Sequence, residues 1–278
     1  MYADCIICSG KGEMQLKNKR ARPLLYGGKT VGFVNTKFCR RLVLLSVCII
    51  IACAVILLQM WKMKSLRDGA PVGRQVLLDV PFISQRDKYP NACESVSSVM
   101  ALQYFGVPIS VEEFVGQYLT VGIAPYTDAD GIRRGCNPWC AFPGNPCDKT
   151  GWGCYAPVIS KALKSIPLLE DFEILELYDL PISELCSRYI DQAIPVILWA
   201  TIDMQEPRPG VSWNILGTDE AFTWISPMHC LLLTGYDDIY YYFNDPLEKK
   251  DCRYSKDSVE TAYAGMYRQA VVILKKGA

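Results

Sequence analysis

The sequence predicts a domain of mixed helices and strands that follows a single transmembrane helix. Three features support this prediction: an apolar stretch at 42–61, a helical pattern that begins near Cys93, and apolar, β-prone segments at 195–202, 230–234 and 239–243. About two hundred residues remain after the apolar stretch, enough for one domain with a buried core. The formal net charge is zero, so nothing indicates a nucleic-acid partner.

Residues 1–41 are predicted to form a basic tail on the cytoplasmic side of a membrane. They carry nine Lys or Arg and few large apolar side chains, a composition typical of poorly ordered segments. Cys5 and Cys8 form one Cys-x-x-Cys, which is weak evidence for zinc without a second pair or a nearby histidine. Two reduced thiols are the preferred interpretation.

The apolar residues 42–61 predict the membrane span, and with it a membrane partner for the chain. At ~1.5 Å per residue a helix of this length reaches about 30 Å, the thickness of a bilayer core. A cleaved signal peptide is the alternative, disfavoured because the basic region before the stretch is too long and no small-x-small site follows. Lys and Arg are slightly more frequent before the span than after it, which favours a cytoplasmic N-terminus and a domain outside a bacterial cell.

Residues 62–75 are predicted to be a linker, because Gly69, Pro71 and Gly73 interrupt regular structure, and the domain covers 76–278. In chain order we expect a short strand at 76–82, helices at 92–105 and 110–118, a loop at 120–153, a helix at 155–163, a strand at 174–177, a helix at 182–191, a strand at 195–202, a polar connection at 203–223, strands at 230–234 and 239–243, a helix at 255–264 and a closing strand at 270–275.

Cys93 is the first candidate catalytic residue. Pro90 cannot lie inside a helix and Asn91 is a good N-cap, so a helix begins just before Cys93 and ends near Gly106. A cysteine in the first turn lies beside free amides and the positive end of the helix dipole, which lowers the pKa of a thiol and favours the thiolate. The alternative is a small buried hydrophobic residue without chemistry.

The long predicted loop contains a cluster of the chain's 13 cysteines. A structureless loop of this length is usually functional or held by cross-links. Disulfides are the first interpretation for an exported domain. A four-cysteine zinc site is the second, although the spacing matches no known zinc knuckle. The four residues are Cys136, Cys140, Cys147 and Cys154. We expect no other cofactor.

His229 is the only histidine, so any imidazole chemistry must use it. The two predicted strands that follow it are joined by turn residues and should form a hairpin centred near Asp237. His229 and Asp245 lie equally far from this centre, so we expect them opposite each other with Cβ atoms about 4.5 to 5.5 Å apart. A one-residue slip would bring Asn244 opposite instead, which makes Asn244 the reserve orienting residue.

These positions together resemble the parts of a thiol-dependent active site. A thiol activated by histidine needs a third group that fixes the imidazole ring, and Asp245 would supply it. Gln85 lies eight residues before Cys93 and could donate its side-chain amide to a developing oxyanion, alongside the backbone amide of Cys93. The alternative is a structural histidine beside an aspartate that caps a turn.

The residues around these positions resemble a known family. Gln85 followed by Tyr-Pro-Asn-Ala-Cys-Glu-Ser, and His229 followed by Gly-Tyr-Asp and Asn-Asp-Pro, are similar to the bacteriocin-leader (double-glycine) peptidase-like group of papain-like cysteine peptidases. The similarity is closest to its uncharacterised membrane-anchored branch in Gram-positive bacteria. It covers about residues 76–275 and includes the segments 153–159 and 198–201.

The resemblance implies an α+β, papain-like fold, with a helical lobe that carries the nucleophile and an antiparallel sheet lobe that carries the base. It implies that Cys93 is the nucleophile, His229 the general base and acid, Asp245 the orienting acid and Gln85 the oxyanion donor. We therefore expect a membrane-anchored cysteine peptidase or amidase that cuts peptide or protein substrates at the cell surface. An acyl or peptidyl transferase and a non-catalytic peptide-binding module are the alternatives.

Overall fold

The computed structural model describes residues 36–68 and 75–277, and the chain divides into two compact units at Gly69. The first unit contains one long helix, α1 (Thr36–Asp68). This helix begins six residues before the predicted span and ends seven residues after it, because the first helix-breaking residue beyond Thr36 is Gly69. Residues 62–68, predicted to belong to a linker, are therefore helical.

The prediction of a membrane span at 42–61 is not supported. Among the described residues, no helix combines the length and the apolar character that crossing a bilayer requires. The described side chains of α1, from 44 to 60, are all exposed. The location of the domain outside a bacterial cell stays a prediction, and most of the predicted basic tail, residues 1–35, lies outside the described residues.

The second unit is built on a seven-stranded sheet in which all neighbouring strands are antiparallel. The strand order is β12-β11-β10-β7-β13-β6, and β1 pairs with β10 outside this path. At that pairing a side chain on residue 235 would collide with β1, since a Cβ on Gly235 would lie 2.2 Å from the carbonyl oxygen of Val76. The strands are β1 (Val76–Leu77), β6 (Phe172–Tyr178), β7 (Val196–Thr201), β10 (Met228–Tyr236), β11 (Tyr240–Asn244), β12 (Cys252–Ser255) and β13 (Gln269–Lys275).

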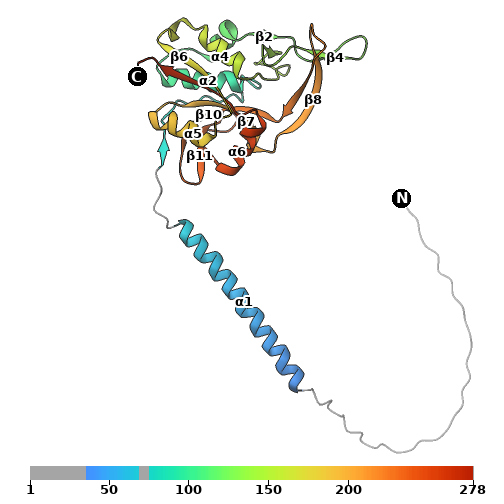
Figure 1. The fold of residues 1–278 in the computed structure, drawn as a ribbon, viewed down its shortest axis with the longest axis vertical. Helices are drawn as coiled ribbons and strands as arrows, with labels where there is room; N and C mark the ends of the chain where they lie inside the picture. The colour runs from blue at the N-terminus through green and yellow to red at the C-terminus, as the bar shows by residue number, and fades with distance from the viewer. Residues whose placement is uncertain (1–35, 69–74, 278) are drawn as a thin grey trace, which may run out of the picture. The chain divides into compact units, whose positions relative to one another are not determined.

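Helices cover both faces of this sheet (Figure 1). The helices and helical turns of this unit are α2 (Cys93–Tyr104), α3 (Val111–Glu113), the π-helical turn η1 (Phe114–Tyr118), α4 (Ala156–Lys164), η2 (Pro167–Leu169), α5 (Ile182–Arg188), η3 (Ile190–Gln192), η4 (Ile202–Met204) and α6 (Lys256–Gly265). One core cluster joins α2 and α4 to the sheet, and the other joins α5 and α6 to it.

Alternation along β10 explains why this whole strand is apolar. Cys230 and Leu232 belong to the core cluster with α2, whereas Leu231 and Leu233 belong to the cluster with α5 and α6. A strand buried on both faces is expected to show a continuous apolar run. This position in the middle of the sheet places the beginning of β10 beside the beginning of α2.

A smaller four-stranded sheet lies next to this core, with strand order β3-β4-β8-β9 (Figure 1). The polar connection predicted at 203–223 is wrong, because most of it belongs to the β8–β9 hairpin. Trp213, Phe222 and Trp224 of this hairpin are buried while most residues around them are exposed, so the strands bury one aromatic face. The short strands are β2 (Val121–Gly122), β3 (Tyr126–Thr127), β4 (Arg133–Gly135), β5 (Phe142–Pro143), β8 (Arg208–Ile215) and β9 (Ala221–Ser226).

The predicted helix caps have mixed outcomes. Ser110 caps α3 as predicted, since its Oγ accepts a hydrogen bond of 3.0 Å from the backbone N–H of Glu113. The prediction for Asn91 is wrong, because Ala92 is the N-cap of α2. The Asn91 side-chain amide instead donates to the carbonyl oxygen of Asp148, 57 residues further along the chain.

The predicted disulfides are also wrong, since Cys136, Cys140, Cys147 and Cys154 are all free thiols. Their segment is held by the β2–β5 pair and by side-chain bonds, such as the 3.0 Å bond from Trp213 Nε1 to the carbonyl oxygen of Cys136. The zinc alternative finds no support either. Within 75–277, as in the described part of α1, no three His, Cys, Asp or Glu side chains are placed to hold a metal ion.

Candidate active site

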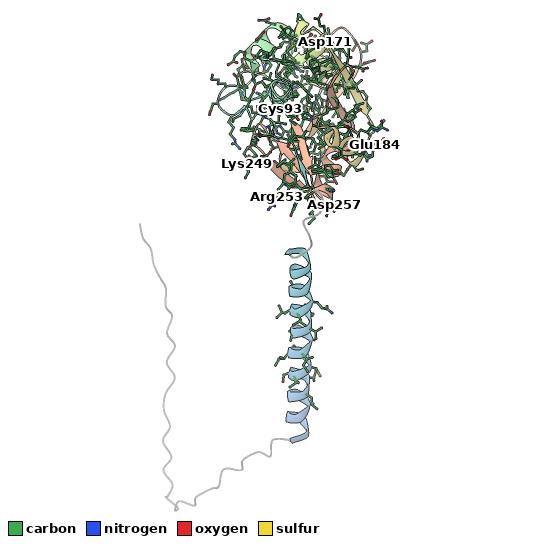
Figure 2. The ribbon with its side chains drawn as sticks, turned by 90° about the vertical axis from the view of Figure 1, so that its left-hand side faces the viewer. Cys93, Asp171, Glu184, Lys249, Arg253 and Asp257 are labelled. Carbon is green, nitrogen blue, oxygen red and sulfur yellow. The ribbon has the colours of Figure 1, made fainter. Side chains whose placement is uncertain are left out.

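Cys93 is the first residue of α2 and is buried. Figure 2 shows it inside the globular unit, whereas the charged residues Asp171 and Asp257 lie at its periphery. Burial raises the pKa of the Cys93 thiol well above its ordinary value, and the neighbouring Glu94 carboxyl raises it further. The pKa lowering predicted from the helix terminus is therefore not found.

Two backbone amides oppose this effect. The N–H groups of Cys230 and Glu94 form hydrogen bonds with the sulfur of Cys93, and both lower the pKa of the thiol. Cys230 directly follows His229 on β10. The thiol therefore lies beside the end of the strand that carries the chain's single imidazole.

His229 and Asp245 form a buried pair. The imidazole Nε2 lies 2.8 Å from Asp245 Oδ1, and each side chain is only 2% exposed. Burial raises the pKa of the Asp245 carboxyl, but the hydrogen bond and charge of His229, with hydrogen bonds from Tyr254 and Leu247, lower it below its usual value overall. An ionised Asp245 requires Nε2 to carry a hydrogen, which leaves Nδ1 of the neutral ring as an acceptor.

The structure brings these two side chains together by a different register from the predicted one. Tyr236 pairs with Tyr241, so the turn is centred between Asp238 and Ile239 rather than at Asp237, and beyond an irregularity between Leu233 and Gly235 the residue Leu232 pairs with Asn244. If this register continued, Asp245 would lie opposite Leu231, two residues from His229. The two side chains are thus diagonal neighbours, a relation that long side chains can bridge.

Asn244, the reserve candidate, does not contact the imidazole. Its Nδ2 donates to the carbonyl oxygens of Val80 and Pro81 at 3.2 and 3.1 Å, and its Oδ1 accepts from the N–H of Asp251 at 3.2 Å. The Nδ2 end of the amide therefore fastens the loop before α2 to the end of β11, and the Oδ1 end holds the turn before β12. Of the two candidates, Asp245 is the residue in contact with His229.

Gln85 lies in the turn between β1 and α2 and is buried. Its backbone N–H donates to the carbonyl oxygen of Pro246 at 2.9 Å, which ties it to the residue after Asp245. Its Nε2 donates to the carbonyl oxygen of Pro90 at 3.0 Å, close to the start of α2. A primary amide has two N–H donors, so one remains for a second acceptor.

Glu94 contacts the thiol directly and was not among the predicted site residues. The Cys93 thiol donates to Glu94 Oε2 at 3.3 Å, and Glu94 Oε1 accepts from the backbone N–H of Cys154 at 2.6 Å. Burial raises the pKa of Glu94 to about 7, although the Cys154 hydrogen bond acts in the opposite direction. The feature that could have indicated Glu94 is its charge, which is unusual in a helix whose first ten residues are all buried.

The described residues therefore place a thiol at a helix start, beside a strand end that carries an imidazole held by a carboxylate. Gln85 links the segments on either side of this arrangement through its backbone and its side-chain amide. This set of groups can support nucleophilic chemistry by sulfur with proton transfer by an imidazole.

Comparisons of sequence and of structure find proteins that resemble this chain. YvpB of Bacillus subtilis (strain 168), described as uncharacterized, is 29% identical over 200 residues, which cover 71% of this chain and 76% of YvpB. A crystal structure of a C39-like peptidase from Bacillus anthracis is 26% identical, with a TM-score of 0.60, and covers 74% of this chain and 100% of that one. A double-glycine-motif protease from an AMS/PCAT transporter, in complex with its leader peptide, has 15% identity and a TM-score of 0.41 over 73% of this chain and 99% of its own.

The similarity to the Bacillus anthracis structure agrees with the resemblance seen in the sequence, although it does not extend to the membrane-anchored branch. The family model for the Peptidase_C39 like family matches residues 77–271, which include every candidate site residue. The chain belongs to the Peptidase_C39 like family.

Proposed function

We propose that this protein is a cysteine peptidase that hydrolyses peptide bonds with Cys93, His229 and Asp245. The observation that carries this proposal is the buried imidazole–carboxylate pair at the start of β10, followed by a backbone N–H directed at the sulfur of Cys93. Membership of a peptidase family supports a peptide substrate.

In this proposal the thiol proton of Cys93 moves to Nδ1 of His229, and Asp245 stabilises the resulting imidazolium through Nε2–H. The thiolate attacks the carbonyl carbon of the scissile bond, and the carbonyl electron pair moves to oxygen. Collapse of this intermediate breaks the C–N bond, while the imidazolium gives its proton to the leaving amine. Water then loses a proton to the imidazole and attacks the thioester, which releases the acid and restores the thiol.

Gln85 is proposed to stabilise the oxyanion with the N–H of its amide that is not bonded to Pro90. Replacement of Gln85 by alanine should lower kcat/KM by about 10²- to 10³-fold, mainly through kcat, because this donor acts on the charge of the transition state. Steady-state kinetics on one peptide would measure the loss.

Gln103→Ala is the matched control, because Gln103 lies at the other end of α2 and its Nε2 also donates to one carbonyl oxygen, that of Ile109. An equal loss in both variants, or a loss in the Gln85 variant that follows its melting temperature, would contradict the oxyanion role.

The experiment that tests the proposed function is incubation of the purified full-length chain with a mass-encoded peptide library. Cleavage at defined peptide bonds, with one oxygen taken from isotope-labelled water at the new carboxyl group, is the expected result. Products that carry an added amine instead of water oxygen would assign a transferase. A library recovered intact, without a thioester on Cys93, would reject both chemistries.

A further inference from the structure

The carboxyl group of Glu94 connects the proposed nucleophile to the segment before α4. One oxygen, Oε2, contacts the Cys93 thiol at 3.3 Å, and the other, Oε1, accepts the N–H of Cys154 at 2.6 Å. Trp199 Nε1 donates to the carbonyl oxygen of Cys154 at 2.8 Å, so both backbone groups of Cys154 are held. The carboxyl is thus held against the sulfur by a segment that lies outside its own helix.

The surroundings of this carboxyl exclude solvent. Glu94 is fully buried, and Gly153 approaches it so closely that a Cβ at this position would lie 2.7 Å from Oε1. The same Cβ would lie 2.2 Å from Met228 Cε and 3.1 Å from Trp224 Cη2. In such an enclosed apolar environment a charge on the carboxyl acts strongly on the neighbouring sulfur.

We propose that Glu94 controls the ionisation of the Cys93 thiol. A charged Glu94 carboxylate accepts the thiol hydrogen and repels a thiolate, which keeps the sulfur protonated. A protonated Glu94 donates its O–H to the thiolate and stabilises it, so the thiol proton is more readily transferred to His229. This inference rests on the proposed function, and it makes Glu94 a positioning residue that acts through Cys93.

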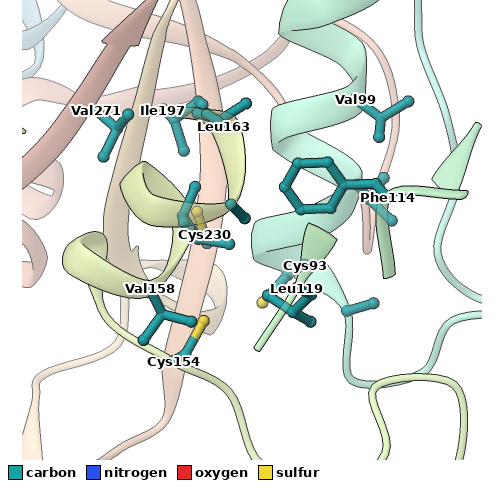
Figure 3. Close-up of a cluster of buried hydrophobic side chains, with 14 of the residues drawn as sticks. Cys93, Val99, Phe114, Leu119, Cys154, Val158, Leu163, Ile197, Cys230 and Val271 are labelled. Atoms are coloured by element: carbon teal, nitrogen blue, oxygen red, sulfur yellow. The ribbon is translucent and has the colours of Figure 1, made fainter. Parts of the chain in front are cut away.

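The titratable groups around Glu94 leave this control to its carboxyl. The side chains that interact with Glu94 or the Cys93 thiol are Cys154 and Tyr155 before α4 and Cys230 on β10. Burial raises the pKa of Cys154 and Cys230 well above the ordinary thiol value, and burial also raises the pKa of Tyr155. Figure 3 shows Cys93, Cys154 and Cys230 in the same part of the core.

The pH dependence of Cys93 alkylation tests the inference. Glu94→Gln retains an oxygen that can accept the Cys154 N–H, but it removes the negative charge beside the sulfur. We expect the midpoint of the alkylation rate with iodoacetamide to fall by at least about one pH unit, which makes alkylation about tenfold faster at pH 7. Mass spectrometry of the digested protein would quantify the Cys93 adduct separately from the other thiols.

Glu113→Gln is the matched control, since Glu113 is also an acidic residue in the first turn of a helix, and its midpoint should equal that of the wild type. An unchanged or higher midpoint in a folded Glu94→Gln variant would overturn the inference. Alkylation requires no substrate, so a shifted midpoint in a protein that cleaves no peptide would reject the proposed function and keep the role of Glu94. A protein that cleaves peptides but whose Glu94→Gln variant shows no shift of the alkylation midpoint would keep the proposed function and reject the role of Glu94.

A second measurement tests the inference without the Glu94→Gln variant, in case that variant does not fold. The hydrogen bond from the Cys93 thiol lowers the pKa of Glu94, and coupling between two titrating groups is reciprocal. Removing the thiol by Cys93→Ala should therefore raise the pH at which the buried carboxyl loses its proton. Infrared difference spectra of the protonated carboxyl stretch would show this shift, and identical titrations in the two proteins would reject the inference.

Discussion

Replacement of Cys93 by alanine should lower kcat/KM for a cleaved peptide by about 10⁴- to 10⁶-fold, because no thioester can form without the sulfur. The remaining groups would still bind the peptide and polarise its carbonyl, so KM should change little. Steady-state kinetics, with mass spectrometry of the trapped acyl-enzyme, would measure both the loss of turnover and the loss of the covalent intermediate.

The control for this variant is Cys140→Ala, which removes an exposed thiol of the loop between β4 and β5. Its kinetics and its melting temperature should match those of the wild type. Undiminished turnover in a folded Cys93→Ala protein would end the assignment of this thiol as the nucleophile, whatever the activity of the Cys140 variant.

Replacement of His229 by glutamine should lower kcat/KM by about 10³- to 10⁴-fold. A glutamine amide can donate to Asp245, so the buried carboxylate keeps a partner and the loss reflects the missing base rather than an unpaired charge. Without an imidazole that accepts the thiol proton, alkylation of Cys93 below neutral pH should also become slower. Both rates can be measured on the same protein preparation.

A double variant shows whether Cys93 and His229 act as one unit. When two groups carry out one step together, the effects of removing them do not add. The Cys93→Ala, His229→Gln protein should therefore have about the same kcat/KM as the less active of the two single variants. Losses that multiply would indicate that the imidazole acts independently of the thiol. Full activity of the single His229 variant would exclude it as the general base.

The parts of the fold that were predicted correctly are those in which burial alone decides the pattern. The strand at 195–202 and the strand that begins near Cys230 are buried on both faces, so their apolar runs are visible in the sequence. The position of Cys93 in a first helical turn followed from Pro90 and from helical spacing. The family resemblance was likewise carried by short local motifs, and the family model that matches 77–271 bears it out.

The parts that could not be predicted depend on contacts between distant segments. Glu94 owes its place in the site to the backbone of Cys154, 60 residues away, and nothing in the local pattern of either segment indicates this contact. Tyr254 donates to Asp245 Oδ2 at 2.8 Å from β12, a strand that was not expected. Tyr236 pairs with Tyr241, so the hairpin turn is centred beyond Asp237, which the turn residues alone did not indicate.

The pairing of β1 with β10 limits how this chain can diverge at the start of its globular unit. The carbonyl oxygen of Val76 occupies the space that a side chain at Gly235 would need. A change at Gly235 therefore requires a change in the backbone at Val76. A homologue that acquires any larger residue at the position of Gly235 must also abandon the two-residue strand, and its polypeptide must then join the domain by another route.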